Sequence, residues 1–330
     1  MSEFDLIDRY FLSATVDRDD VKLGIGDDAA LLQVPPGQLL AVSADTLVDG
    51  VHFPTGTCAE DVGHKALAVN LSDLAAMGAT PAWATLALTL PAQSAEWLSG
   101  FMVGFKALAK RFNVALVGGD TTRGPMTITV QIMGHVGVNS GLTREGARPG
   151  DRIFVTGHLG DAALALHLFN SDGVSNDPDA VCLAALRPRL DRPQPRVNEG
   201  LALRDLASSA IDLSDGLLSD LGHIVKASGC GATIYRDQVP RSGEFDQWLA
   251  AQSTTTADAV ANQFLLNGGD DYELCFTVAP DRLDALNQLD WQACGGIAEV
   301  GVISQEAGLR LVDRAGLDLP LPASGYDHFQ

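Results

Sequence analysis

The sequence predicts a mixed α/β (α+β) protein built from two domains. The chain has 330 residues, which exceeds the usual size of a single hydrophobic core, so two domains are expected. Helical and alternating hydrophobic patterns follow one another along the chain, which indicates mixed α and β elements. A turn-rich break, Gly-Ala-Arg-Pro-Gly-Asp at residues 146–151, places the boundary. We therefore predict domains at residues 1–145 and 146–330.

In the first domain, helices are expected where apolar residues recur every three or four positions, and strands where they alternate. Residues 3–12 give a short helix, and residues 59–77 give a buried helix that carries Asp73. Because burial makes a carboxylate costly, Asp73 is expected to need a positive partner. Strands are expected at residues 30–34, 39–43, 83–90, 115–117 and 127–136, and a second helix contains Trp97, Phe101, Phe105 and Leu108.

The second domain continues the mixed pattern. Residues 192–196, Arg-Pro-Gln-Pro-Arg, cannot be helical, and we interpret their two arginines as structural. Residues 210–227 predict a strand, a turn and a helix, a geometry that suits phosphate or metal binding. No periodicity predicts an element in residues 241–261. The remaining strands are expected at residues 152–156, 232–235, 273–278, 297–303 and 309–312. Three further helices are expected: one at residues 160–169, one that ends near residue 186, and one at residues 281–289.

Composition restricts the class of protein. Hydrophobic residues make up 46% of the chain and charged residues 19%, which is typical of a globular protein. The formal charge of −20, from 42 acidic and 22 basic residues, argues against a nucleic-acid or anionic-membrane surface, because both need clustered Lys and Arg. An acidic balance can reflect solubility alone, or carboxylates gathered to hold hard cations.

The cysteines and the N-terminal sequence indicate the cellular compartment in which the protein is expected. The chain has no Cys-x-x-Cys pair, so neither a zinc site nor a disulfide framework is expected. The N-terminus is acidic, and no stretch approaches the roughly 18 apolar residues of a membrane span. We expect a soluble cytoplasmic protein whose cysteines are small core residues, namely Cys58, Cys182, Cys230, Cys275 and Cys294.

Six short acidic segments share one pattern, in which an apolar run leads into Gly, Ser or Thr beside Asp. Each alone is also typical of an ordinary polar turn, but six of them suggest a common cause. Close carboxylates repel, by about 4 kcal/mol per pair at an effective dielectric near 20, so they converge only if cations hold them. Ligands that are all oxygen favour Mg²⁺ or Mn²⁺ over zinc. The segments are residues 24–32, 42–46, 70–73, 117–122, 211–216 and 267–273.

The common nucleotide-binding signatures are missing from the chain. No Gly-x-x-x-x-Gly-Lys-Ser/Thr loop or Gly-x-Gly-x-x-Gly fingerprint occurs in it. If phosphates bind, metals rather than a lysine cradle must neutralise them, because Mg²⁺ keeps coordination positions open for phosphate oxygens.

Seven motifs in order resemble those of the bacterial thiamine-monophosphate kinase family. This family belongs with the aminoimidazole-ribonucleotide-synthetase-like ATP-binding proteins. The resemblance runs from the N-terminal helix to the C-terminal aromatic tail. It implies an N-terminal domain that forms a β-barrel across a dimer and a sandwich-like α/β C-terminal domain. The motifs are Gly-Asp-Asp-Ala-Ala, Ser-Ala-Asp, Gly-Val-His-Phe, the run at residues 65–79, Gly-Gly-Asp-Thr, Asp-Leu-Ser-Asp-Gly-Leu and Gly-Gly-Asp-Asp-Tyr-Glu-Leu.

The resemblance also implies site residues, with Asp45, Asp73 and Asp120 as the catalytic set. Nucleotide contacts fall on Gly119, Asp120, Arg144 and Ser214, and thiamine-phosphate contacts on His52, Asp270 and Tyr326. The implied magnesium ligands are Asp28, Ser43, Asp45, Asp73, Asp120, Asp212 and Asp215.

This chain departs from the family pattern at three positions. Ala44 stands where Thr is common, so only its carbonyl could ligate a metal. Met102 stands where a Tyr commonly meets ATP, and Asp270 replaces the more usual Glu.

The individual residues also allow structural roles. Asp212 and Asp215 could cap a helix, and Arg144 could be a surface cation. His52 could be a structural hydrogen-bonder, and Tyr326 a packing residue.

The expected activity is ATP- and Mg²⁺-dependent phosphorylation of thiamine monophosphate by a homodimer. A phosphate monoester has a second pKa of about 6, so the acceptor needs no general base. We therefore expect direct in-line transfer without a phosphoenzyme. No monovalent-ion requirement follows from the sequence.

Two alternatives remain open. One is another ATP-dependent synthetase of the same superfamily; a selenophosphate synthetase would be expected to carry a Cys or selenocysteine near its N-terminus, whereas the first cysteine here is Cys58. The other is a non-catalytic protein that binds divalent cations.

Overall fold

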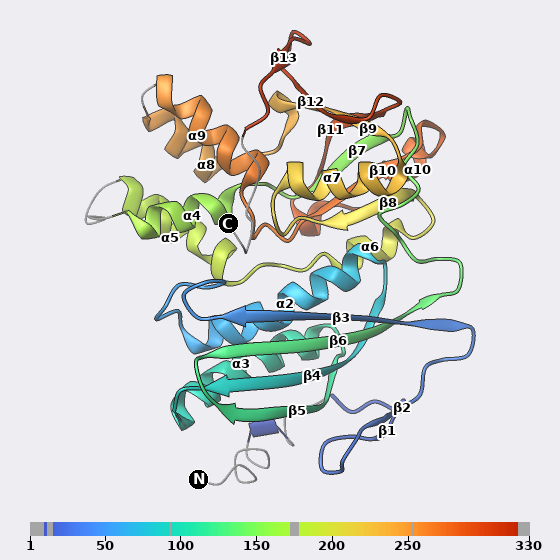
Figure 1. Cartoon of the computed structure of the whole chain (residues 1–330), viewed down its shortest axis with the longest axis vertical. Helices are drawn as coiled ribbons and strands as arrows, with labels where there is room; N and C mark the ends of the chain where they lie inside the picture. Colours follow the sequence, from blue (N-terminus) through green and yellow to red (C-terminus); the bar gives the residue numbers. More distant parts are fainter. Residues whose placement is uncertain (1–9, 12–15, 93, 172–177, 253, 323–330) are drawn as a thin grey trace. The chain divides into compact units, whose positions relative to one another are not determined.

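The computed structural model describes residues 10–11, 16–92, 94–171, 178–252 and 254–322 (Figure 1). The chain divides into two compact units, which are described separately. The first comprises residues 1–74 and 78–141, and the second residues 75–77 and 142–330. Among the described residues, no helix is long and apolar enough to cross a membrane.

The first unit follows the order β1, β2, β3, α2, β4, α3, β5, β6. Its described strands form a two-stranded sheet and a four-stranded sheet of order β3-β6-β4-β5. In the larger sheet only β4 and β5 run parallel, because α3 connects them as a crossover. The elements are β1 (Val21–Leu23), β2 (Leu31–Leu32), β3 (Gln38–Val48), α2 (Ala59–Ala76), β4 (Thr80–Leu90), α3 (Ala95–Arg111), β5 (Ala115–Arg123) and β6 (Thr127–Gly137).

Helices α2 and α3 lie on one face of the four-stranded sheet (Figure 1). On β6, Ile128, Val130 and Ile132 are buried at every second position, as a strand with one covered face requires. The helices approach each other closely at two glycines. A Cβ on Gly104 would lie 1.9 Å from the carbonyl oxygen of Glu60, and one on Gly63 equally close to that of Phe101.

The other face of this sheet is only partly covered. Trp83 is fully buried beneath residues of the β1–β2 hairpin, and its indole N–H donates to Asp20 at 3.0 Å. On the edge strand β3, Leu40 is 46% exposed and Val42 is 51% exposed. An apolar strip of β3 is therefore left uncovered.

The second unit contains one described sheet of seven strands, with the order β13-β12-β9-β11-β7-β10-β8. Only β12 and β9 pair in parallel; the other neighbours are antiparallel. Its elements are β7 (Arg152–Thr156), α4 (Asp161–Asn170), α5 (Pro178–Asp191), α6 (Val197–Leu203), β8 (Ala207–Asp212), α7 (Leu217–Ser228), β9 (Gly231–Tyr235), α8 (Gly243–Ala251), α9 (Thr254–Asn267), β10 (Leu274–Val278), α10 (Leu283–Leu286), β11 (Ile297–Ser304), β12 (Gly308–Val312) and β13 (Asp318–Leu319).

Alternate residues of the central strands point to opposite faces of the sheet, so each face contributes to a different packed layer. Ile153 and Val155 of β7 belong to the main core, which also holds residues of α4 and α7. Phe154, between them, points to the other face and stacks on Phe276 at a ring separation of 5.6 Å. The mixed α/β class is therefore confirmed.

Several sequence expectations need correction. Residues 241–261 contain α8 and the start of α9, and α6, β1 and β13 were also missed. The helix expected at residues 281–289 is only α10 after a 3-10 turn. The strand expected to end at Val117 continues to Arg123, so Asp120 lies within β5, just as Asp45 lies within β3. Both are edge strands, where an exposed polar side chain is tolerated.

The cysteine expectation holds for four of the five thiols. All five are free, but Cys58 is exposed rather than part of a core. The expected N-terminal helix falls mostly outside the described residues, and the aromatic tail falls wholly outside them.

Candidate active site

Three of the predicted magnesium ligands lie together where strand β3 meets helix α2. Ser43 and Asp45 are two positions apart on the strand, so their side chains point to the same face. The Ser43 hydroxyl donates a hydrogen bond of 2.5 Å to Oδ2 of Asp73. The N–H of Asp45 donates to Oδ1 of Asn70, three residues before Asp73, at 3.2 Å. Helix α2 is mostly buried, as expected, but Asp73 itself is half-buried rather than buried.

Asp120 lies at the opposite edge of the same sheet. It pairs with Ala87, which pairs with Thr129, which in turn pairs with Thr46. Residues paired directly across neighbouring strands point to one face of a sheet. Asp120 therefore shares a face with Thr46, opposite to the face of Asp45.

Asp28 is exposed in the turn between β1 and β2, where its N–H donates to the side chain of Asp27 at 2.9 Å. Within the described part of the chain, no three side chains of His, Cys, Asp or Glu are gathered so that they could hold a metal ion. Asp28 and Asp120 thus lie apart from Ser43, Asp45 and Asp73.

The donor set of Ser43, Asp45 and Asp73 fits magnesium. Its side-chain donors are all oxygen, the type that Mg²⁺ prefers over nitrogen or sulfur. Mg²⁺ is commonly held by one or two carboxylates together with waters and substrate phosphates. Two carboxylates and a hydroxyl are therefore a sufficient protein contribution.

In the second unit, main-chain hydrogen bonds join two of the acidic turns. The N–H of Asp270 donates to the carbonyl of Ser214 at 3.0 Å, and that of Tyr272 to the carbonyl of Leu213 at 2.8 Å. A Cβ on Gly269 would lie 2.4 Å from the Ser214 oxygen, so this approach requires glycine. Asp212, Ser214, Asp215 and Asp270 thus belong to one assembly.

The backbone of the turn at residues 268–272 is strained. Asp270 has φ 68° and Tyr272 has φ 50°, both in the left-handed region. Non-glycine residues in this region cost of order 1–3 kcal/mol each and cluster at functional sites.

Asp220 in the first turn of α7 supports the neighbouring acidic turn. It is 3% exposed, and its Oδ2 accepts a hydrogen bond from the N–H of Asp215 at 3.1 Å. Burial, reinforced by the carboxylates of Asp215 and Asp212, raises the pKa of Asp220 to about 8. Asp220 is not among the site residues expected from the sequence. The signal was an acidic side chain in the first helical turn, where carboxylates commonly bind free N–H groups.

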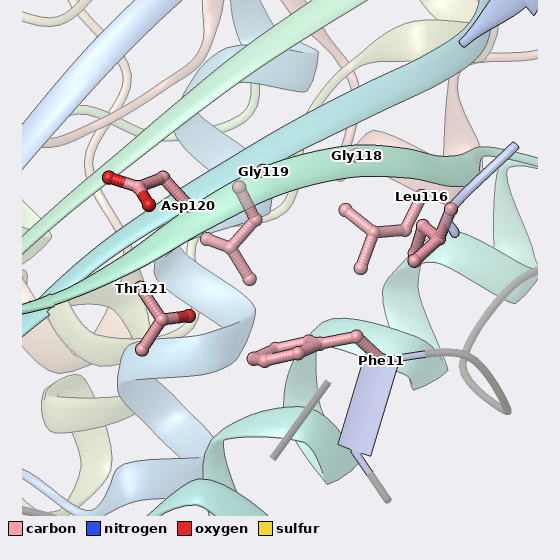
Figure 2. Close-up of a pocket in the computed structure, with 8 residues that line it drawn as sticks. Phe11, Leu116, Gly118, Gly119, Asp120 and Thr121 are labelled. Atoms are coloured by element: carbon pink, nitrogen blue, oxygen red, sulfur yellow. The ribbon is translucent and has the colours of Figure 1, made fainter. Parts of the chain in front are cut away.

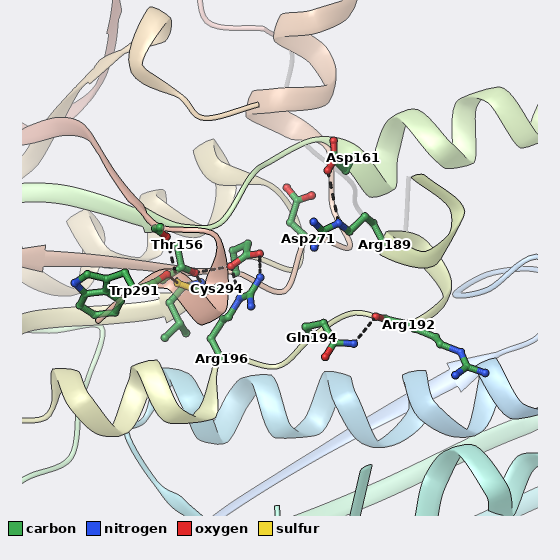
Figure 3. A network of polar contacts seen from close by, with 12 residues as sticks. Thr156, Asp161, Arg189, Arg192, Gln194, Arg196, Asp271, Trp291 and Cys294 are labelled. Carbon is green, nitrogen blue, oxygen red and sulfur yellow. Dashed lines mark hydrogen bonds and ion pairs between the residues drawn. The ribbon is translucent and has the colours of Figure 1, made fainter. Parts of the chain in front are cut away.

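Arg196 and Glu273 form a buried ion pair beside the same assembly (Figure 3). The Arg196 Nε donates to Glu273 Oε2 at 2.6 Å, and its Nη2 donates to Oε1. Thr156 also donates to Glu273 Oε2, at 2.6 Å. The structural interpretation of Arg196 is therefore confirmed.

The remaining predicted residues are placed as follows. His52 closes the turn after β3, because its Nδ1 accepts from the N–H of Val48 at 3.0 Å. This contact gives His52 the structural hydrogen bond foreseen as its alternative role. Arg144 is exposed, and its carbonyl accepts from Ser228. Tyr326 lies outside the described residues.

A pocket of the first unit contains the predicted nucleotide-binding residues Gly119 and Asp120 (Figure 2). A Cβ on Gly119 would lie 1.9 Å from the carbonyl oxygen of Leu86, so the pairing of β5 with β4 requires glycine here. The rest of the lining is formed by Phe11, Ile25, Leu86, Leu116, Gly118 and Thr121.

Comparison with known proteins first defines the class. The model for the N-terminal domain of AIR synthase related proteins matches residues 26–136, and that for the C-terminal domain matches residues 148–314. These matches cover more than half of the chain, and the chain is an AIR synthase related protein.

Full-length relatives define the family within this class. A thiamine-monophosphate kinase of Salmonella typhimurium is 49% identical, over 99% of this chain and 98% of that protein. The Escherichia coli K12 enzyme of the same name is 47% identical over the same shares. The crystal structure of the Stenotrophomonas maltophilia thiamine-monophosphate kinase is 48% identical with a TM-score of 0.83, covering 94% of this chain and 96% of that one. The chain belongs to the thiamine-monophosphate kinase family and is a phosphotransferase.

A solved complex extends the comparison to bound ligands. It is described as AaThiL complexed with AMPPCP and TMP, and it is 29% identical to this chain. Its TM-score is 0.77, and the match covers 99% of this chain and 97% of that one.

Proposed function

We propose that this protein transfers the γ-phosphoryl group of ATP to the phosphate of thiamine monophosphate, which yields thiamine diphosphate. The observation that carries the proposal is the similarity over the whole length of the chain. The Salmonella relative, 49% identical over 99% of this chain, is named for this activity. The solved complex with AMPPCP and TMP supports a pairing of nucleotide and phosphorylated acceptor.

Each unit contributes residues with assigned roles in this proposal. In residues 1–145, Asp28, Ser43, Asp45, Asp73 and Asp120 hold Mg²⁺, Gly119 contacts the nucleotide, and His52 contacts the acceptor. In the second unit, which begins at residue 142, Asp212 and Asp215 hold Mg²⁺, and Arg144 and Ser214 contact the nucleotide. Asp270 and Tyr326 contact the thiamine phosphate. The contact between Ser43 and Asp73 supports the first group, and the hydrogen bond between Asp270 and Ser214 supports the second.

The proposed transfer is direct and in line. The acceptor phosphate, with a second pKa of about 6, is largely dianionic at neutral pH, so no side chain needs to remove a proton. When bound, several Mg²⁺ ions supply the charge neutralisation that lets two phosphate groups approach. The chain's own residues align the two substrates and exclude side reactions, and none forms a phosphoenzyme.

We further propose a homodimer in which the four-stranded sheets of two chains form one barrel. The uncovered strip on β3, with Val42 51% exposed, supports this, because large apolar side chains gathered on a strand mark interaction surfaces. Light scattering of Val42→Glu is expected to give a monomer. Val103→Glu on α3, where Val103 is 54% exposed, is the matched control; a dimeric Val42→Glu protein would contradict the assignment.

The cytoplasm is the proposed site of action. The five free thiols, four of them buried, support a reducing compartment.

A coupled assay of ADP formation tests the activity. The purified protein is offered ATP and Mg²⁺ with thiamine, thiamine monophosphate or aminoimidazole precursors, each in a separate reaction. Of the three acceptors, only thiamine monophosphate is expected to give ADP. ADP with an aminoimidazole precursor would point to a synthetase of the same class, and no ADP with any acceptor would point to a cation-binding protein.

A further inference from the structure

The segment that carries Arg144 runs along β8, the last strand in the order of the described seven-stranded sheet. The N–H of Ala210 on β8 donates to the carbonyl of Thr143 at 2.9 Å. Gly146 has φ 128°, and a Cβ there would lie 2.2 Å from the carbonyl oxygen of Ser208. The close approach of this segment to β8 therefore requires glycine at residue 146.

A single hydroxyl group on helix α7 holds the same segment. Ser228 is the last residue of α7, and its hydroxyl donates to the carbonyl oxygen of Arg144 at 3.2 Å. The hydroxyl oxygen also accepts from the N–H groups of Gly146 at 3.2 Å and Ala147 at 3.1 Å. One donated and two accepted hydrogen bonds use the full capacity of a hydroxyl group. Ser228 thus fixes the main chain of residues 144–147.

The side chain of Arg144, in contrast, is available to a ligand. Arg144 is exposed, and within the part of the chain that the structure describes its guanidinium makes no hydrogen bond or ion pair. A long arginine side chain has about 2 kcal/mol of rotamer entropy to lose when it is ordered. A fixed main chain limits the region that the guanidinium can reach, which reduces the entropy lost when an anion binds.

Helix α7 is attached to both elements of the second unit that are proposed to contact the nucleotide. It begins directly after Gly216, which closes the acidic turn that contains Ser214, and it ends at Ser228. The turn and the Arg144 segment therefore lie at opposite ends of one helix.

We propose that Ser228 is a positioning residue for the nucleotide and that it acts through Arg144. The inference rests on the proposed contact between Arg144 and the nucleotide, and it adds a residue that none of the seven sequence motifs includes. Ser228 holds the Arg144 main chain, and the Arg144 guanidinium makes the contact with the ligand.

A double-mutant cycle tests this proposal by calorimetry with AMPPCP, an ATP analogue, in the presence of Mg²⁺. Ser228→Ala is expected to weaken AMPPCP binding roughly threefold to tenfold, the scale of one lost hydrogen bond. Arg144→Ala should weaken it roughly tenfold or more, because a hydrogen bond from a charged donor is stronger. The double variant should bind no more weakly than Arg144→Ala alone, because Ser228 acts only through Arg144.

Two further measurements separate positioning from a general loss of structure. Ser228→Thr keeps the hydroxyl and should bind AMPPCP as the wild type does. In steady-state assays, Ser228→Ala should raise the KM for ATP and leave the KM for thiamine monophosphate unchanged. Ser171→Ala is the matched control, because Ser171 caps the end of α4 in the same unit and its hydroxyl donates to the carbonyl of His167.

Three outcomes overturn the proposal: unchanged AMPPCP binding in Ser228→Ala, losses that add in the double variant, or an equal loss in Ser171→Ala. If Ser228→Ala does not fold, Thr143→Val is measured in its place, with the same expected results. The Thr143 hydroxyl donates to the carbonyl of Glu145 at 2.6 Å and so spans Arg144.

A wild-type protein that forms no ADP with thiamine monophosphate would defeat the proposed function instead. That result is distinguishable from an active enzyme whose AMPPCP affinity is indifferent to Ser228.

Discussion

The Ser43 hydroxyl donates to the Asp73 carboxylate across 2.5 Å, from an edge strand to the neighbouring helix. This contact fixes Oδ2 of Asp73, and a carboxylate can accept several hydrogen bonds at once. The same arrangement holds the side chain in one orientation before any ligand binds, which reduces the entropy lost on binding.

Asp73→Asn is expected to reduce turnover by about 100-fold or more, because the amide cannot supply the negative charge that a metal ligand needs. The fold should be retained, since Oδ1 of Asn can still accept from Ser43. Steady-state ADP formation and a thermal melt measure the two effects. Asp19→Asn, an exposed position, is the control. Full activity in Asp73→Asn would remove this residue from the metal set.

His52→Asn distinguishes substrate contact from turn formation. Asn can accept the hydrogen bond from Val48 that His52 now accepts, so the turn should persist. If His52 contacts the acceptor, the KM for thiamine monophosphate should rise more than the KM for ATP. His52 would have a purely structural role if His52→Asn kept the wild-type KM values for both substrates and only His52→Ala lowered the Tm.

Glu273→Gln is expected to destabilise the protein by about 3–5 kcal/mol, because it leaves the buried Arg196 guanidinium without its charge partner. Equilibrium urea unfolding measures this loss. The matched control is Glu299→Gln, whose ion pair with Arg152 is exposed and should contribute at most about 1 kcal/mol. If both variants lost a similar free energy of unfolding, burial would not be the reason that the Arg196–Glu273 ion pair stabilises the protein.

Cys182 and Cys58 should differ in how their reactivity toward a disulfide reagent depends on pH. Burial, with help from the carboxylates of Asp179 and Asp161, raises the pKa of Cys182 to about 11. Because the thiolate is the reactive form, a raised pKa leaves Cys182 protonated at pH 8 and unreactive until the pH approaches 11. Cys58 is exposed and should react at pH 8. Labelling of native Cys58→Ser with a disulfide reagent at pH 8 should therefore be slow; rapid labelling would contradict the assignment.

Gly104→Ala and Gly222→Ala form a pair with opposite expectations. A Cβ on Gly104 would meet the Glu60 carbonyl at 1.9 Å, so α2 and α3 must separate, whereas nothing lies within 4 Å of a Cβ on Gly222. Gly104→Ala should lower stability by about 1–3 kcal/mol. Gly222→Ala, inside α7, should raise it by about 0.5–1 kcal/mol. Urea unfolding measures both, and a neutral Gly104→Ala would show that the helices have room to adjust.

Strongly periodic segments could be predicted from the sequence, and segments determined by tertiary packing could not. The patterns of α2 and β6 are regular, and both elements were foreseen. Residues 254–256 are three threonines, which have low helix propensity, yet they begin α9. In α8, the packing of Phe245 and Trp248 into the core outweighs a weak local pattern.

The candidate site shows the same division. The acidic segments could be recognised as a group, and Ser43, Asp45 and Asp73 do meet. The opposite orientation of Asp120 depends on how four strands pair, which no local pattern encodes. Asp220 was missed because its role depends on burial beneath a turn, and the available signal, an acidic residue in the first helical turn, does not distinguish a buried carboxylate from an exposed one.

The hydrogen bonds between residues 213–214 and 270–272 have a mechanical consequence. These main-chain hydrogen bonds join two loops that are more than fifty positions apart in the chain. A movement of one loop is therefore coupled to a movement of the other. Under the proposed roles, a displacement of Asp270 on the acceptor side would be transmitted through this hydrogen bond to Ser214 on the nucleotide side.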